Sequence, residues 1–243
     1  MSASDNTALP WRRMVMESVA IILSILLAFA IDAGWDELKE RNQEEAFLVS
    51  LLSDFKETRS RIEESNTIHM KFIESCQQLL SFHGVDTPNI ETEALEKMLG
   101  SVFYDFNSLY LPTGSRDALF ASGDIEIISN EKLRSMLAAW PTIVADASED
   151  DALIAYDVMN AMAPYLNSKV RTRNVVRSTD SPTAAELIPP IESVNYEVLW
   201  MDPEFDNIVS FRILNETYAI MENDNLSKAA NEIIQVIERE LAR

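Results

Sequence analysis

Apolar residues form one dense run near the start of the chain. No charged residue occurs from Ser18 to Ile31, and the run widens to Met14 through Ala33 when Glu17 and Asp32 are counted at its two ends. At about 1.5 Å of rise per residue, the wider run is about as long as a bilayer core is thick. The pattern therefore predicts a transmembrane anchor over residues 14–34, a short tail over residues 1–13 and a folded domain over residues 35–243.

Two other interpretations of this run remain open. Trp11 and Trp35 flank the run as the aromatic belt of a membrane helix would. A cleaved signal peptide is the first alternative, because basic residues precede the run and Ala28-Phe29-Ala30 has the small-x-small form of a cleavage site. Against it, the helical pattern continues past Ala30 without an extended stretch. The second alternative, a buried core helix, would need other elements to cover it on all sides.

Basic residues favour one orientation of the anchor. Arg12 and Arg13 precede it, whereas Lys39 and Arg41 follow it among acidic residues. Cytoplasmic flanks of membrane helices are enriched in Lys and Arg. The tail is therefore predicted to be cytoplasmic and the folded domain extracytoplasmic.

Small residues recur along one side of the anchor. Ala20, Ser24 and Ala28 follow one another at four-residue steps, and Asp32 continues the same stripe. Small residues at this spacing let two membrane helices approach closely, which predicts self-association. Alternatively, Ala and Ser are simply common in short membrane helices.

The rest of the chain has the periodicity of helices. No Gly or Pro occurs between Trp35 and Phe82, and the apolar residues there keep mostly to three- and four-residue steps, with an irregularity near Ser65-Asn66-Thr67. Asp202-Pro203 opens a last long helix. The predicted fold is all-α: the anchor continues into an antiparallel bundle of long helices, with shorter middle helices packed at one end.

Charge excludes one class of partner. The chain has 40 acidic and 20 basic residues and a net charge of −20. Such a surface repels phosphate backbones, so nucleic-acid binding is not expected. Cys76 is the only cysteine; no internal disulfide can form, and its apolar neighbours predict a buried side chain.

Two stretches carry a resemblance to a known family. The apolar helix runs into Trp35-Asp36-Glu37, and DALFASGDIEIISNEKLRSMLAAW follows at Asp117 to Trp140. The chain thereby resembles a family of uncharacterised bacterial membrane-anchored proteins, which share this order of elements over most of the chain. The resemblance implies a single-pass protein of the bacterial inner membrane and implies no activity. Asp32 departs from the family pattern and leaves the membrane boundary open.

The mid-chain motif has a structural explanation. Gly123 is predicted to end one helix, Asn130 to cap the next, and Arg134 to pair with a carboxylate such as Asp117 or Asp124. No catalytic role is needed to account for it.

Sequence motifs for chemistry are absent. His69 and His83 lack the spacing of a metal site and are predicted to be surface or flanking residues of the first long helix. The Glu149-Asp150-Asp151 run is predicted to be a solvated helix face. No nucleotide-binding loop or nucleophile elbow occurs, so no cofactor and no metal ion is expected.

Three functional hypotheses follow. The first is a membrane-tethered helical interaction or scaffold protein that associates with itself or with an envelope protein. The second is a sensor that binds an anion through Arg171, Arg173 and Arg177 in the irregular stretch 170–195, unless these residues merely balance acidic neighbours or contact anionic headgroups. The third is an enzyme with an unrecognised site around Tyr104 to Tyr110, although we expect no enzymatic activity.

Overall fold

The computed structural model describes residues 11–85, 89–181, 183–192 and 194–243, and the part it describes contains helices and no strand. Residues 1–10 of the expected tail lie outside the described residues. The predicted all-α class is confirmed. The elements in chain order are α1 (Trp11–Leu80), α2 (Thr92–Phe103), α3 (Gly114–Ser122), a 3₁₀ turn (Asp124–Ile127), α4 (Glu131–Asp157), a π-helical turn (Val158–Met162), α5 (Ala163–Lys169), α6 (Arg173–Arg177), α7 (Ala184–Leu187), α8 (Glu197–Trp200) and α9 (Pro203–Leu241).

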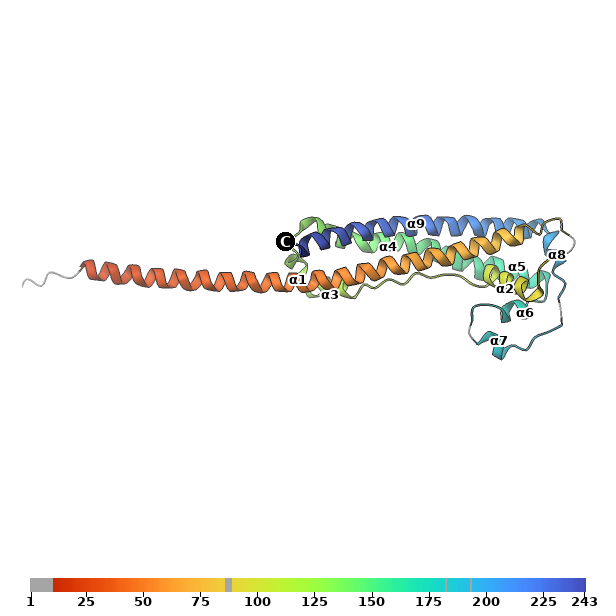
Figure 1. Cartoon of the computed structure of the whole chain (residues 1–243), viewed down its shortest axis with the longest axis horizontal. Coiled ribbons are helices and arrows are strands. Elements are labelled where there is room, and N and C mark those ends of the chain that lie inside the picture. The colour runs from red at the N-terminus through yellow and green to blue at the C-terminus, as the bar shows by residue number, and fades with distance from the viewer. Residues whose placement is uncertain (1–10, 86–88, 182, 193) are drawn as a thin grey trace, which may run out of the picture.

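Helix α1 is a single element of 70 residues. It stays unbroken because no proline and only Gly34 falls within it, and nothing lies within 4 Å of the position where a Cβ on Gly34 would be. All described side chains from Met14 to Gln43 are exposed, and this part of α1 projects from the bundle as a lone helix (Figure 1). The interpretation of the apolar run as a buried core helix is therefore wrong.

Helices α1 and α9 are antiparallel along the whole bundle. Lys56 pairs with Glu238 at 2.9 Å, and further along α1, Asn66 donates to Asp224 at 3.1 Å. At the far end, His83 Nδ1 lies 3.0 Å from an oxygen of Asp206. The residue numbers of the partners on α9 therefore decrease as those of α1 and its following turn increase. The C-terminus lies beside α1 where the bundle begins (Figure 1).

The third long element is α4 together with the π turn and α5. Pro164 lies at the start of α5. A proline has no N–H and its ring clashes with the carbonyl four residues earlier in an α-helix, which here belongs to Asn160. The π turn over Val158–Met162 widens the helix at this carbonyl, and the rod continues past the proline.

Two apolar clusters fill the bundle, one toward each end. The cluster nearer the apolar segment includes Leu51 and Phe55 of α1 with Trp140 of α4, and the Phe55 and Trp140 rings meet edge to face with centroids 4.9 Å apart. The far cluster is built around Phe103, Trp200 and Phe205, whose rings stack or meet at edges. On α1 the first cluster ends at Ile62 and the second begins at Cys76. Between them α1 buries the polar Ser65 and His69 and, beyond these, the apolar Phe72 and Ile73.

The shorter elements lie at both ends of the bundle. Helices α2, α6, α7 and α8 lie at the far end, and α3 lies near the start of the bundle (Figure 1). A non-helical segment over residues 104–113 joins α2 to α3 and runs back along α1 (Figure 1). This segment carries backbone donors and acceptors into the bundle, and they need partners there.

Candidate functional site

The candidate site is a layer of charged side chains buried between the two apolar clusters. His69 of α1 and Glu216 of α9 have exposed fractions of 1% and 0%, and Arg212 of α9 and Asp151 of α4 have 2% and 7%. The prediction that His69 lies at the surface is wrong, as is the prediction of a fully solvated face for Asp151. His83 is exposed, as predicted. We call these four residues the charge layer.

His69 connects three helices through its two ring nitrogens. Nδ1 contacts an oxygen of Glu216 on α9, and Nε2 lies 3.3 Å from Oδ1 of Asp151 on α4. Asn107 Nδ2 has two hydrogens: it donates to Ser65 Oγ at 2.7 Å and lies 3.3 Å from Nε2, to which it can donate only when Nε2 carries no proton. Because carboxylates only accept hydrogen bonds, the contacts with Glu216 and Asp151 are both hydrogen bonds only when both ring nitrogens carry a proton.

Arg212 supplies the second positive charge of the layer. Its Nε forms an ion pair with Glu216 one turn along α9, although neither that nitrogen nor the facing carboxylate oxygen has an aligned hydrogen bond. Its guanidinium lies 5.0 Å from the ring centroid of Phe72, and its Nη2 donates to the carbonyl of Asp105 at 3.1 Å. The layer therefore contains two cations and two carboxylates, whose charges cancel, and burial shields all four from bulk water.

The charge layer also holds the extended segment 104–113 in place. The second oxygen of Asp151 accepts a hydrogen bond from the backbone N–H of Leu109 at 3.0 Å, and Arg212 donates one to the carbonyl of Asp105. Ser65 accepts from Asn107 of the segment and from Asn223 of α9. Polar side chains from α1, α4 and α9 thus satisfy a stretch of chain that has no helical hydrogen bonds of its own.

The surroundings of His69 favour its charged form. Burial alone would lower its pKa, but the hydrogen bonds that the ring donates to Asp151 and Glu216 and the negative charge of both carboxylates outweigh burial and raise the pKa to about 9. Cys76 is buried as predicted, and burial raises the pKa of its thiol to about 12. Arg212 lowers and Glu216 raises the pKa of the same thiol, so Cys76 lies within the field of the layer.

The layer lacks the features of a catalytic or metal site in the described structure. Two surface hollows lie on exposed faces of α1, one lined by residues between Ile25 and Trp35 and one by residues between Lys71 and Ser81, and neither is lined by any of the four charged residues. No group of His, Cys, Asp and Glu among the described residues could hold a metal ion. The charge layer links α1, α4 and α9 through side-chain contacts.

The aromatic-rich stretch Tyr104 to Tyr110 is part of the extended segment. Tyr104 donates to Asn167 at 2.7 Å, whereas Tyr110 is exposed. Asp105 is the one carboxylate in the stretch, and burial raises its pKa. The side chain of Asp105 accepts the backbone N–H of Asp180, so it contacts the loop that follows α6.

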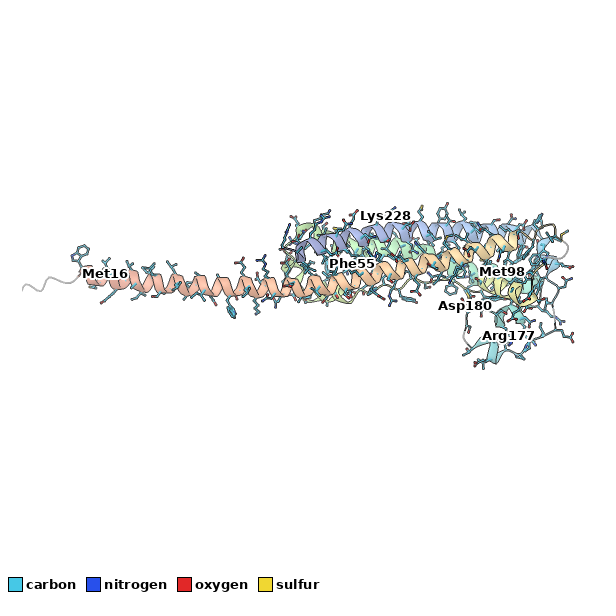
Figure 2. The ribbon with its side chains drawn as sticks, viewed as in Figure 1. Met16, Phe55, Met98, Arg177, Asp180 and Lys228 are labelled. Atoms are coloured by element: carbon cyan, nitrogen blue, oxygen red, sulfur yellow. The ribbon has the colours of Figure 1, made fainter. Side chains whose placement is uncertain are left out.

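The three arginines of the 170–195 stretch do not all face outward. Arg177 donates to the carbonyls of Ala185 and Ile188 and so closes the loop around α7 (Figure 2). Arg171 and Arg173 are exposed and have no hydrogen bond or ion pair within the described ranges. The helices of this stretch, α6 and α7, lie at the end of the bundle opposite the apolar segment (Figure 1), far from the headgroups of any bilayer that would hold that segment.

The mid-chain motif fastens the near end of the bundle. Gly123 ends α3 with a φ of 80°, where glycine has no steric penalty, and the side chain of Asn130 caps α4 by accepting from Leu133 N at 3.0 Å, as predicted. The prediction that Arg134 pairs with a carboxylate is wrong: it donates to the carbonyls of Ile128 and Ser129. These carbonyls precede α4 and have no helical partner, so the guanidinium satisfies them.

The small residues that recur along one side of the apolar segment are exposed on α1. Ala20, Ser24 and Ala28 lie on one side of the helix, and Ser24 Oγ donates to the Ala20 carbonyl at 2.8 Å. Trp35 follows at the end of the segment and is 70% exposed. Met16, near the start of the segment, projects from the lone helix (Figure 2).

Sequence reasoning missed the charge layer because its members are far apart along the chain. The irregularity near Ser65-Asn66-Thr67 was the one local signal, since it marks the level at which α1 changes from apolar to polar contacts. On α9, Arg212 and Glu216 occupy inward positions between Val209 and Leu226. A polar interruption at matching levels of two predicted antiparallel helices could have indicated a buried layer.

No family model, no curated protein and no solved structure matches the chain. The fold and the site are therefore described from their own geometry alone.

Proposed function

We propose that the protein is a membrane-tethered helical interaction protein, with residues 14–34 in a bilayer and the acidic bundle free to contact other proteins. One observation carries the proposal: the exposed apolar segment and a core helix of the bundle are the same unbroken α1. An exposed run this apolar is stable in hydrocarbon and unstable in water. The run is one helix that could cross a membrane by its length and composition.

The proposal extends to compartment and orientation. Arg12 and Arg13 favour a cytoplasmic start, and the resemblance to bacterial anchored proteins favours the inner membrane. The bundle would then lie in the periplasm. Cleavage after Ala30 is disfavoured because α1 continues as helix through residues 28–30, whereas a signal peptidase needs an extended stretch.

A partner surface is supported by the outer face of α9. Phe211, Leu214, Tyr218 and Met221 follow at three- and four-residue steps, which places them on one side of the helix, and their exposed fractions range from 43% to 53%. A row of large apolar side chains on the exposed side of a helix is typical of a protein-contact surface. Envelope proteins are the partners that this location would provide.

Self-association through the anchor forms part of the proposal. The Ala20, Ser24 and Ala28 stripe would let two copies of α1 approach closely, and Ser24 already satisfies its hydroxyl within its own helix. We expect Ser24→Leu or Ala28→Leu to lower the signal of a transmembrane dimerisation reporter. Ile25→Leu, on another side of the helix, is the matched control; an unchanged signal in all three variants would refute anchor-mediated association.

The anchor and its orientation are tested by fractionating cells that express the full chain with a C-terminal tag. Protease is added to spheroplasts, and the mass of the product is measured. The proposal requires a full-length, membrane-bound, protease-sensitive product. A soluble product cleaved after Ala30 would refute the anchor, and a protected membrane-bound product would reverse the orientation.

The α9 surface is tested by placing a photo-crosslinking residue at position 218 in the membrane-bound protein. The control is position 228, where exposed Lys228 lies on the same helix (Figure 2). We expect crosslinked species from position 218 that are absent or much weaker from position 228. Equal crosslinking from both positions would remove the α9 face as the partner surface.

A further inference from the structure

The charge layer buries four ionisable side chains at positions that apolar side chains could fill. His69, Asp151, Arg212 and Glu216 are each at least nine-tenths buried. Burying such a set costs several kcal/mol of desolvation per ion, and apolar residues of the same size would often stabilise a bundle as well or better. The layer is therefore a candidate for a role beyond stability.

The geometry makes the layer depend on one proton. His69 faces Asp151 on α4, Glu216 on α9 and the amide of Asn107 in the extended segment. Behind Glu216, Arg212 pairs with the same carboxylate and donates to the Asp105 carbonyl. With both ring nitrogens protonated, the layer has two positive and two negative charges. Loss of one proton leaves one carboxylate facing a ring nitrogen lone pair and gives the layer a net negative charge.

We propose that protonated His69 is a latch that holds α1 against α4 and α9, and that its deprotonation opens the bundle at this level and at the adjoining edge of the far cluster, where Cys76 lies. The rest of both apolar clusters stays packed, because the clusters contain no member of the layer and are held by dispersion and burial, which a proton does not change. Opening is therefore confined to the middle of the bundle and to that edge. The latch requires neither a membrane nor a partner.

The raised pKa of His69, about 9, supports this latch, because it places the loss of the proton in mildly alkaline solution. The extended segment should loosen together with the helices, since Asp151 holds both His69 and Leu109. No change is expected at the near end, where Asn130 and Glu240 join α4 to α9.

Cys76 provides a native reporter of the opening. It is the only cysteine, its exposed fraction is 0%, and it lies two helical turns beyond His69 on α1. The charges of Arg212 and Glu216 both shift the pKa of its thiol. A thiol reagent can reach it only when the bundle opens near the layer.

The test measures the rate at which Cys76 of the folded full chain in detergent reacts with a small disulfide reagent. At each pH the rate is divided by the rate of the same chain in denaturant, which removes the pH dependence of the thiol itself. We expect the protection of Cys76 to fall by about fiftyfold from about pH 7 to about pH 9.5. His69→Gln should remove this pH dependence, and His83→Gln, at the exposed histidine, should retain it.

Two outcomes would overturn the latch: constant protection in the wild-type chain, or an unchanged pH dependence in His69→Gln. If His69→Gln does not fold, the ring-proton signals of the wild-type chain replace it, because only two histidines contribute. The signals of the buried histidine should then titrate well above the ordinary histidine pKa of about 6.5. A titration midpoint at or below that ordinary value would likewise refute the proposal.

Discussion

Oδ1 of Asp151 lies 3.3 Å from Nε2 of His69, and the other oxygen of the same carboxylate accepts the backbone N–H of Leu109. One side chain of α4 therefore holds both α1 and the extended segment. Elsewhere α1 and α4 meet through apolar contacts such as that between Phe55 and Trp140. The middle of the bundle is joined by charge, and its ends are joined by packing, so the two regions should respond to different perturbations.

Stability should fall as the pH rises. The pKa of His69 is raised from 6.5 to about 9 in the folded chain, so the folded state binds this proton more tightly than the unfolded state does. The resulting stabilisation is fully present below about pH 6.5 and is lost as the pH rises through about 9, which amounts to about 3 kcal/mol. Urea denaturation of the full chain in detergent at several pH values measures it; a flat profile over this range contradicts the assignment.

Neutralising Glu216 should be strongly destabilising. Glu216→Gln leaves the charges of His69 and Arg212 with one carboxylate between them, and breaking a buried ion pair costs about 3–5 kcal/mol. The control is Glu57→Gln, which breaks an exposed pair with Arg61 on α1 and should cost less than about 1 kcal/mol. Denaturation midpoints of the two variants decide the matter, and similar losses would mean that the layer is hydrated.

Removing the cap of α4 should loosen the near end of the bundle. Asn130→Ala deletes the acceptor for Leu133 N and the donor to Glu240, and cap loss alone costs about 1 kcal/mol. Asn130→Asp keeps the cap acceptor but places a carboxylate beside Glu240, so it should recover only part of the loss. Thermal unfolding of both variants checks this order; a fully stable Asn130→Ala would contradict it.

Core and surface phenylalanines should differ sharply. Phe55→Ala empties a buried site against Trp140 and should cost about 3–5 kcal/mol. Phe211→Ala removes a ring that is 53% exposed on α9 and should change stability by less than about 1 kcal/mol. If Phe211→Ala weakens crosslinking from position 218 without loss of stability, the surface role of α9 is supported; a large loss of stability assigns the ring to the core.

Local signals in the sequence predicted much of the fold. The absence of Gly and Pro between Trp35 and Phe82 predicted a long helix, and Asp202-Pro203 predicted the start of α9, where the Asp202 side chain accepts Glu204 N at 3.0 Å. Gly123 and Asn130 were also readable because helix ends depend on residues within one turn. Each of these signals lies within a few residues of the structure that it indicates, so it can be recognised in a single sequence.

The charge layer was not readable in the same way. Asp151 belongs to a run of three acidic residues, and successive residues on a helix point about 100° apart, so one of the three faces inward when the others do not. Which one it is depends on how α4 is rotated against α9. Likewise, Arg134 found backbone carbonyls in place of a carboxylate, because the turn before α4 leaves those carbonyls without helical partners.

The unbroken course of α1 gives the two ends of the bundle different heights. If residues 14–34 stand upright in a bilayer, as we propose, the end of α1 at Leu80 would stand about 70 Å above the membrane boundary, whereas the start of the bundle at Glu44 would stand only about 15 Å above it. A short protein in the same membrane would then reach α3 and the C-terminus but not α6 and α7. Only a tall partner, or one fixed in an opposing layer, would meet that far end.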